Sequence, residues 1–338
     1  MAIYLKKFEN HTQYDNYING SDAILPNVSI CTTEGDVHYN PYVEPPETRL
    51  VAKYNVTSTS SPTKIGYNQY TNGFSEIEID GVVQPSVVSA YTFSTTGEHT
   101  VKYTLTDPTS IGENAFCFCS GLISIDIPNS VTSIGLSAFY QCMSLTSIDI
   151  PYSVTSIRGS AFALCRNLTS ITISNSVTSI GGAAFQQCGF TSITIPNSVT
   201  TIGDGAFRES RLTSIDIPDS VTSIGNSAFY QCTSLTSCTI GSGVTSISNS
   251  AFYACNSLTS IDIPSGVTSI GNEAFTNCRS LTIITSNATT APTVNWNVFK
   301  NVKTSGTLYV PIGSSGYDVW MNTNSYFLGY YNWTKVEQ

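Results

Sequence analysis

The sequence "SAFYQCMSLTSIDIPYSVTSI", residues 137–157, returns almost unchanged as "SAFYQCTSLTSCTIGSGVTSI", residues 227–247. Its Ala-Phe dipeptide occurs eight times, and successive Phe residues are 22 or 23 positions apart. These are Phe116, Phe139, Phe162, Phe185, Phe207, Phe229, Phe252 and Phe275. A fixed period of this length is typical of a solenoid, because one such unit cannot bury its apolar side chains alone and must pack against its neighbours.

Each repeat contains an extended segment defined by its apolar residues. In the second repeat, Leu145, Ile148 and Ile150 follow the spacing L-x-x-I-x-I, the strand signature of leucine-rich repeats. Side chains alternate along a strand, so Asp149 is expected on the outer face, and Pro151 ends the strand because it cannot donate a ladder hydrogen bond. The S-V-T-S-I segment that follows predicts a second short extended run. The i, i+3 spacing in A-F-x-x-C predicts a helical turn that buries Phe and Cys.

The repeats resemble a known family. The units "SIGNSAFYQCTSLTSCTIGSGVT" and "SIGNEAFTNCRSLT" are similar to the BspA-like class of leucine-rich repeats, found in surface proteins of bacteria and some parasites and in bacteriophages of gut bacteria. The resemblance covers residues 111–282. It implies a mainly β protein with short helical turns, built as a leucine-rich-repeat solenoid of eight coils of 22 or 23 residues.

Other segments flank the array, which we assign to residues 109–285. Residues 286–338 resemble the C-terminal cap of many BspA-like arrays, which protects the open strand edge of a solenoid. Residues 49–108 contain runs of alternating residues and predict a small β-sandwich that also covers the first coil. Residues 1–48 predict an attachment segment with a short polar helix and an extended pair around the turn "TEGD".

The attachment segment bears on the carrier of the protein. Its "LPNVSIC…VHYNP" resembles leader segments in structural proteins of Bacteroidales phages and prophages, and a generic attachment module is the alternative. The start of the chain has no apolar signal region, and no run of about 18 apolar residues occurs, so we expect neither an export precursor nor a membrane insertion.

The charge of the chain argues against several partners. The formal net charge is −9, and charged residues make up 11% of the sequence. No lysine occurs between Lys102 and Lys300. Binding to nucleic acid or to an anionic membrane depends on neutralising phosphates, so neither is expected as a partner.

The cysteines and histidines do not suggest catalysis or a metal site. Seven of the ten cysteines occupy one repeat position and predict a ladder of buried free thiols, because neighbours in a ladder do not face each other as a disulfide requires. These are Cys119, Cys142, Cys165, Cys188, Cys232, Cys255 and Cys278. The histidines His11, His38 and His99 all precede the array, so no Ser-His or Cys-His nucleophile is expected in it. We expect no metal and no cofactor.

Acidic residues recur on the outer face of the predicted strands. They are Asp126, Asp149, Asp216 and Asp262. Residues one coil apart are about 5 Å from each other, near the separation of the two carboxylates in a retaining glycosidase. A repeat fold places any repeated residue at this distance, so a solvated strand face is the favoured interpretation and a glycan-cleaving enzyme the less favoured one.

The most variable repeat positions predict a recognition surface. They are the two positions after Phe and the one after Cys, and they combine Tyr with Gln and Arg, a composition suited to adaptable binding. The candidates are Tyr140, Gln141, Arg166, Gln187, Arg208, Tyr230, Gln231 and Tyr253. Simple drift of exposed positions is the alternative.

Aromatic residues near the C-terminus form a second candidate surface. Trp320, Tyr330, Tyr331 and Trp333 could stack on sugars at the tip of the array, or they could form the core of the cap.

Together these features predict a non-enzymatic recognition protein whose solenoid binds a bacterial surface protein or glycan. The leader resemblance favours a component of a phage virion, a tail or head appendage exposed on the virion surface. A BspA-like adhesin of the bacterial cell surface is the alternative. Residues 1–108 are expected to contact other virion or surface-complex proteins, and the sequence is compatible with a homo-oligomer.

Overall fold

The computed structural model describes residues 30–33, 36–39, 49–66 and 73–338. The chain divides into two units, residues 1–47 and 48–338. In the first, β1 (Ile30–Thr33) and β2 (Asp36–Tyr39) form an antiparallel pair around the predicted turn. The polar helix predicted before this pair lies outside the described residues.

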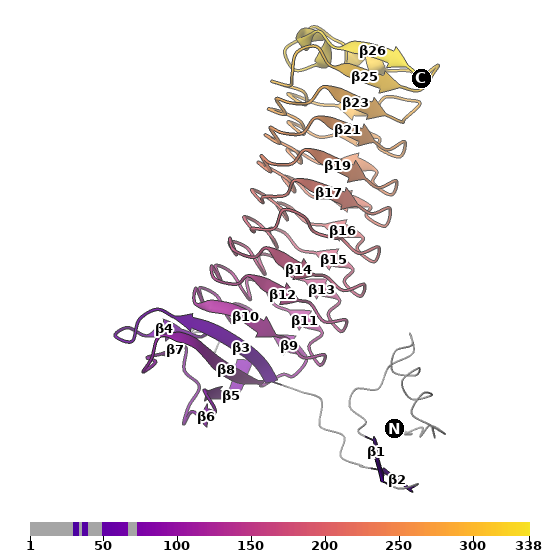
Figure 1. Cartoon of the computed structure of the whole chain (residues 1–338). Coiled ribbons are helices and arrows are strands. Elements are labelled where there is room, and N and C mark those ends of the chain that lie inside the picture. The colour runs from indigo at the N-terminus through magenta and orange to yellow at the C-terminus, as the bar shows by residue number, and fades with distance from the viewer. Residues whose placement is uncertain (1–29, 34–35, 40–48, 67–72) are drawn as a thin grey trace. The chain divides into compact units, whose positions relative to one another are not determined.

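The second unit is a solenoid whose coils stack along one axis (Figure 1). The S-I dipeptides of successive repeats form one parallel sheet of nine short strands. In order these are β9 (Ser110–Ile111), β11 (Ser133–Ile134), β13 (Ser156–Ile157), β15 (Ser179–Ile180), β16 (Thr201–Ile202), β18 (Ser223–Ile224), β20 (Ser246–Ile247), β22 (Ser269–Ile270) and β24 (Thr293–Val294). From Ile111 to Ile270 each isoleucine pairs in register with the isoleucine of the next coil, and Ile270 pairs with Val294, so apolar residues form a continuous row.

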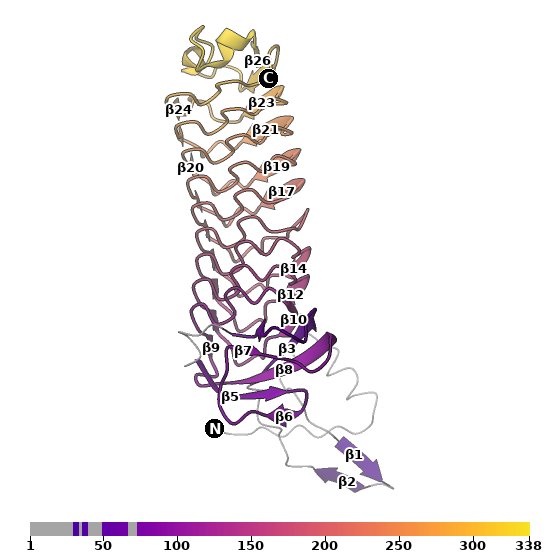
Figure 2. The same ribbon diagram turned by 90° about the vertical axis from the view of Figure 1, so that its left-hand side faces the viewer.

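A second series of strands follows another side of the stack (Figure 2). It comprises β12 (Ser147–Asp149), β14 (Ser170–Thr172), β17 (Ser214–Ile217), β19 (Ser237–Ile240), β21 (Ser260–Ile263), β23 (Ile283–Ser286), β25 (Thr307–Val310) and β26 (Thr334–Glu337). These strands form three separate parallel sheets, β12-β14, β17-β19 and β21-β23-β25-β26. The fourth repeat has no strand here, so the series is interrupted between Thr172 and Ser214.

A stack of phenylalanine rings fills the interior of the coils. Successive rings from Phe116 to Phe299 lie 5.2–6.0 Å apart between centroids, and their planes are within 21° of parallel. All are fully buried. The prediction of eight coils is therefore too low, because Phe299 and β24 continue the array into the segment assigned to the cap. Val298 replaces the expected Ala there, and Phe299 follows Phe275 by 24 positions instead of 22 or 23.

The predicted helical turns are wrong, because the A-F-x-x-C segments form successive tight turns. In the second coil Tyr140 N–H donates to the carbonyl of Ser137 at 3.1 Å, but Gln141 N–H donates to Ala163 of the next coil at 2.9 Å. Gln141 has a φ of +57°, and its equivalent in every other coil is also left-handed. The i, i+3 spacing fits both a helix and this alternation, which links each turn to its neighbour.

The predicted β-sandwich of residues 49–108 is not confirmed. The segment contributes to one antiparallel sheet with the order β10-β3-β8-β5-β6 and to a small pair, β4-β7. Their bounds are β3 (Arg49–Val56), β4 (Thr63–Lys64), β5 (Phe74–Ile79), β6 (Val82–Val83), β7 (Ala90–Tyr91), β8 (Gly97–Leu105) and β10 (Leu122–Asp126). Strand β10 belongs to the first repeat and pairs with β3. The ring centroids of Phe74 and Tyr103 lie 5.5 and 5.1 Å from that of Phe116, so this sheet and the first coil share a core.

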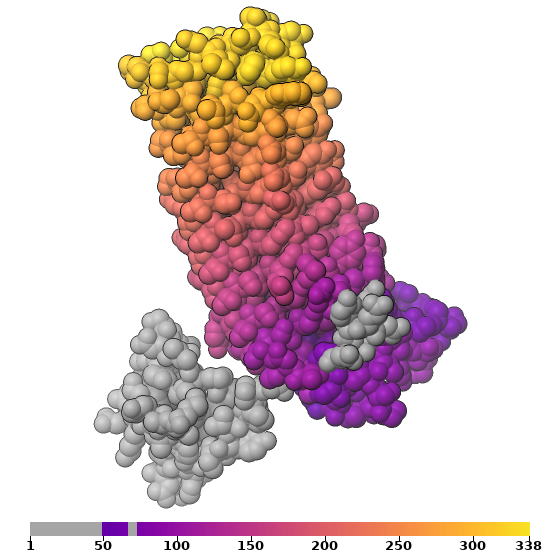
Figure 3. Space-filling view, turned by 180° about the vertical axis from the view of Figure 1, so that it is seen from behind, coloured from indigo at the N-terminus to yellow at the C-terminus, as the bar shows by residue number. Residues whose placement is uncertain are grey.

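The C-terminal end is closed by β25 and β26 with two short 3-10 helices, η2 (Tyr317–Val319) and η3 (Leu328–Tyr331). Seen from behind, the coils are in contact from one end of the array to the other (Figure 3). The solenoid is therefore a rigid support for the side chains that project from it.

Candidate recognition surface

The residues predicted for recognition lie on the tight turns between Phe and Cys. Each turn is held to the next by a backbone hydrogen bond, such as Gln187 N–H to Arg208 O at 2.9 Å and Gln231 N–H to Tyr253 O at 2.7 Å. Equivalent side chains therefore repeat at the spacing of the coils. We call the side chains at the two positions after each Phe and the one after each Cys the ridge.

Six ridge side chains form one continuous series of contacts. Arg166 donates to Gln187 Oε1 at 2.8 Å, and Gln187 Nε2 donates to Glu209 Oε2 at 2.7 Å. Glu209 Oε1 accepts from Arg208 Nε at 3.0 Å. The series continues because Arg208 lies over the ring of Tyr230 at 4.3 Å, which brings a cation onto an aromatic face.

Tyr253 completes this series. Its ring stacks on that of Tyr230 with centroids 4.8 Å apart and planes 4° from parallel. Both rings are half-buried and their positions are set by their neighbours, so little conformational entropy remains to be lost when a ligand binds.

The other ridge candidates are less connected. Tyr140 meets the ring of Phe118 edge-on at 5.5 Å, at the N-terminal end of the array. Gln141 is half-buried and Gln231 is exposed. The structure thus brings together Arg166, Gln187, Arg208, Tyr230 and Tyr253. Glu209 lies at the predicted ridge position equivalent to those of Gln141 and Gln187, but its role as the link between Gln187 and Arg208 was not predicted.

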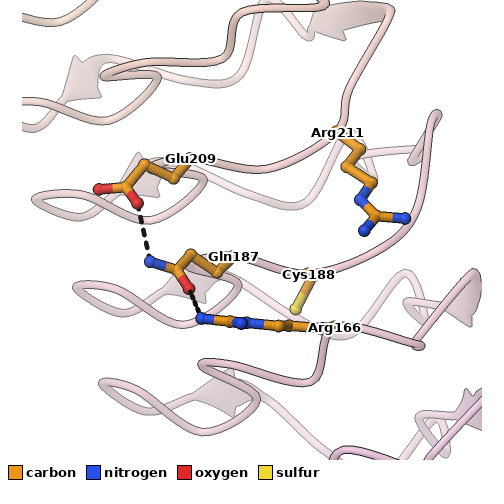
Figure 4. A pocket seen from close by; sticks show the side chains of 5 residues that line it. All are labelled: Arg166, Gln187, Cys188, Glu209 and Arg211. Atoms are coloured by element: carbon orange, nitrogen blue, oxygen red, sulfur yellow. Dashed lines mark hydrogen bonds between the residues drawn. The ribbon is translucent and has the colours of Figure 1, made fainter.

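A shallow pocket of about 300 Å³ opens on the ridge across the third, fourth and fifth repeats (Figure 4). We call it the notch. It is lined by Arg166, Gln187, Cys188, Glu209 and Arg211. Arg211 is a further residue that the sequence analysis did not select, and the signal for it was the shortened repeat in which it lies.

The predicted acidic row on the strand face is present, and its four members are exposed. Asp149, Asp216 and Asp262 lie on parallel strands, each beside a threonine of the next coil. Asp126 instead lies on β10, which pairs antiparallel with β3. Asp126 and Asp149 line a common pocket of about 270 Å³.

This pocket lacks what a glycosidase needs. Glycoside hydrolysis uses one carboxyl group kept protonated, usually by burial, beside one that is ionised. Asp126 and Asp149 are both exposed, and the remaining lining residues are Ser, Ile, Asn and Pro, which do not distinguish one carboxylate from the other. The arrangement supports a solvated strand face.

Most of the aromatic tip is buried. Trp320 and Trp333 use their indole nitrogens to donate to the carbonyls of Pro292 and Lys303, at 3.1 and 2.7 Å. Tyr331 is also buried, so these three rings are part of the core and cannot form the proposed stacking platform. Tyr330 remains 55% exposed.

The cysteine ladder is buried and its thiols are free, as predicted. Cys142 Sγ donates to the carbonyl of Phe116 at 3.2 Å. Cys165, Cys188, Cys232, Cys255 and Cys278 each make the same bond to the Phe carbonyl of the preceding coil, and the series skips the fifth repeat, which has Ser210 at this position. Burial raises the pKa of Cys119 and Cys278 to about 12 and that of Cys232 to about 11. These thiols are therefore neutral at physiological pH and unreactive as nucleophiles.

His99, in β8, is held by structural hydrogen bonds. His99 Nδ1 lies 2.6 Å from the Asp80 carboxylate, and Nε2 lies 3.0 Å from the carbonyl of Thr95. Nε2 also lies 3.3 Å from the hydroxyl of Thr95, so both ring nitrogens are engaged in contacts within the N-terminal sheet region. Among the described residues no cluster of His, Cys, Asp and Glu is suited to a metal ion, and no helix is long and apolar enough to span a membrane.

The architecture and its repeating core define a leucine-rich-repeat solenoid. The family model described as the BspA type leucine rich repeat region matches residues 86–211 and 200–315, with six copies. The chain belongs to this family.

Solved structures of bacterial proteins are also similar. A leucine-rich repeat protein of T. pallidum is 29% identical over 45% of this chain and 72% of that one, with a TM-score of 0.42. A leucine rich cell surface protein of Faecalibacterium prausnitzii is 25% identical over 67% and 82%, with a TM-score of 0.36. A leucine-rich repeat protein of Bacteroides ovatus is 24% identical over 73% and 90%, with a TM-score of 0.28. No curated protein matches the sequence significantly.

Proposed function

We propose that this protein is a non-enzymatic recognition protein that uses the ridge of its solenoid to bind a protein or glycan on a bacterial surface. The observation that carries the proposal is the continuous series from Arg166 to Tyr253. Aromatic rings and guanidinium groups held in place by neighbours are the side chains that contribute most to binding energy at protein interfaces.

The proposed carrier is a phage virion, with residues 1–108 contacting other virion proteins and the solenoid exposed on the virion surface. The support is the leader resemblance within residues 1–48. The second candidate is an adhesin of the bacterial cell surface. Membership in the BspA-type family supports this candidate. Immunogold labelling with antibodies against the solenoid distinguishes them, because the label would decorate either purified phage particles or intact bacterial cells.

Binding of the fluorescently labelled protein to a panel of bacterial cells tests the role of the ridge. We expect Tyr140, Tyr230 and Tyr253, replaced together by Ser, to weaken cell binding about tenfold or more while leaving the fold intact, since interface energy concentrates in aromatic anchors. Tyr152→Ser is the control, because Tyr152 is 66% exposed and lies outside the ridge. Unchanged binding by the triple variant would exclude the ridge as the binding surface.

A further inference from the structure

The notch exists because two consecutive coils are one residue short. Most repeats have two residues between the cysteine position and the next core residue, as in Arg166-Asn167, but the fourth and fifth repeats have only Gly189 and Arg211. The chain therefore takes a shorter path toward the core. A side chain at Gly189 would not fit, because its Cβ would overlap the carbonyl oxygen of Arg166.

The charges around the notch are not balanced. Glu209 is its one acidic lining residue, and its carboxylate already accepts hydrogen bonds from Arg208 and Gln187. Arg166 donates one hydrogen bond to Gln187, and Arg211 makes no hydrogen bond or ion pair within the described part of the chain. Both arginines are exposed. Figure 4 shows the guanidinium group of Arg211 directed into the space above Arg166 and Cys188.

This concentration of positive charge contrasts with the rest of the array. Between Lys102 and Lys300 the only cationic residues are five arginines. One of them, Arg166, lies in the third repeat, and two, Arg208 and Arg211, lie in the fifth. The chain as a whole has a formal charge of −9. An anionic group on a ligand would therefore be attracted to the notch and repelled by most other parts of the molecule.

We propose that the notch binds a carboxylated sugar residue, with its carboxylate between Arg166 and Arg211 and its hydroxyl groups on the Gln187 amide. Guanidinium groups match a carboxylate with paired, charge-assisted hydrogen bonds. The volume of about 300 Å³ is at the small end of ligand sites, which suits one sugar unit. The walls are polar apart from Cys188, whereas a protein side chain used as an anchor is normally received by apolar groups. This inference rests on the proposed recognition function and names a ligand for part of the same surface.

Isothermal titration of the full chain with D-glucuronate, D-galacturonate and N-acetylneuraminate tests the proposal, with D-glucose and N-acetylglutamate amide as comparison probes. We expect at least one acidic sugar to bind more tightly than both comparison probes. Arg211→Gln should weaken that binding about tenfold or more, through loss of a charge-assisted pair. Arg279→Gln should change it less than twofold, because Arg279 is also exposed and occupies the same repeat position outside the notch.

Three outcomes would overturn the assignment. The first is that no acidic sugar binds. The second is that N-acetylglutamate amide binds more tightly than the acidic sugars, which would indicate an acidic peptide as the ligand. The third is that Arg211→Gln and Arg279→Gln weaken binding equally. Circular dichroism of each variant verifies that the fold is retained. Loss of cell binding in the triple tyrosine variant but not in Arg211→Gln would leave the recognition function in place and reject the notch alone.

Discussion

The repeated cysteine occupies a position that requires a small, mostly apolar side chain that can still donate a hydrogen bond. Each thiol lies in the packed interior, and the six from Cys142 to Cys278 donate to a phenylalanine carbonyl of the preceding coil. In the fifth repeat Ser210 occupies this position, and its hydroxyl lies 3.3 Å from Cys232 Sγ. A hydroxyl is therefore tolerated at this buried position when it has a hydrogen-bond partner. The ladder is thus a structural feature that does not need oxidation or metal binding.

Neutral buried thiols predict a loss of stability at alkaline pH. Folding raises the thiol pKa from the ordinary value near 9 to about 12 in Cys119 and Cys278 and to about 11 in Cys232. Above pH 9 the unfolded chain ionises these thiols and the folded chain does not. Their stabilising contribution is therefore complete below pH 9 and is lost progressively as the pH rises from 9 to the folded-state pKa values of about 11 and 12.

Urea unfolding at pH 7, 9 and 10.5 measures this effect. We expect the free energy of unfolding to fall between pH 9 and 10.5, by up to about 1.4 kcal/mol per thiol for each pH unit. Cys278→Ala should be less stable at pH 7 but should lose less stability with rising pH. Equal pH dependence of the two proteins would show that Cys278 is not protected from ionisation.

At the scale of the element, the turn after each Phe depends on left-handed residues that are mostly not glycine. Gln231 has a φ of +56° and an exposed side chain. A β-branched residue is strained in this conformation, and glycine is not. The turns thus carry polar side chains on the ridge at some cost in backbone strain.

Paired substitutions at Gln231 test the turn conformation. We expect Gln231→Val to lower the free energy of unfolding by about 1–2 kcal/mol, and Gln231→Gly to leave it unchanged or slightly raised. Chemical denaturation of both variants against the parent protein measures the difference. A helical turn would reverse this order, with Gly the more destabilising of the two.

The turns also indicate how far the sequence could predict the molecule. The spacing of the Phe residues was sufficient to predict the coils, the parallel strands and the buried cysteines, because each of these features depends on one contact that recurs in every repeat. The coil of Phe299 was not predicted, because Val298 replaces the alanine of the Ala-Phe dipeptide. The turns were predicted to be helical, because i, i+3 spacing is common to helices and to these tight turns. The repeat positions of the ridge were predicted, but the bridge through Glu209 depends on how neighbouring coils align.

At the scale of the whole molecule, the N-terminal sheet is inseparable from the array. The pairing of β10 with β3 joins residues about 70 positions apart, which no local pattern reveals. Phe74 and Tyr103 cover Phe116, the first ring of the stack. Residues 49–108 therefore cover the N-terminal end of the solenoid core, in addition to any other contacts they make.

Truncation tests this role of the N-terminal sheet. We expect the protein that begins at Thr48 to remain monodisperse and to unfold at the same temperature as the full chain. Removal of all residues before Thr109 should expose Phe116 and the edge of β10, and cause aggregation or a clearly lower melting temperature. Size-exclusion chromatography and thermal melts distinguish these results, and equal behaviour of the two truncated proteins would mean that the sheet is an independent domain.

We propose that the solenoid recognises the target and that residues 1–47 do not. The most direct measurement compares the affinity of the full chain and of residues 48–338 for the same bacterial cells. We expect affinities equal within about twofold, because the truncated protein keeps the ridge, the notch and both ends of the array. Loss of cell binding on removal of residues 1–47, with the melting temperature unchanged, would contradict the account and make the solenoid a spacer.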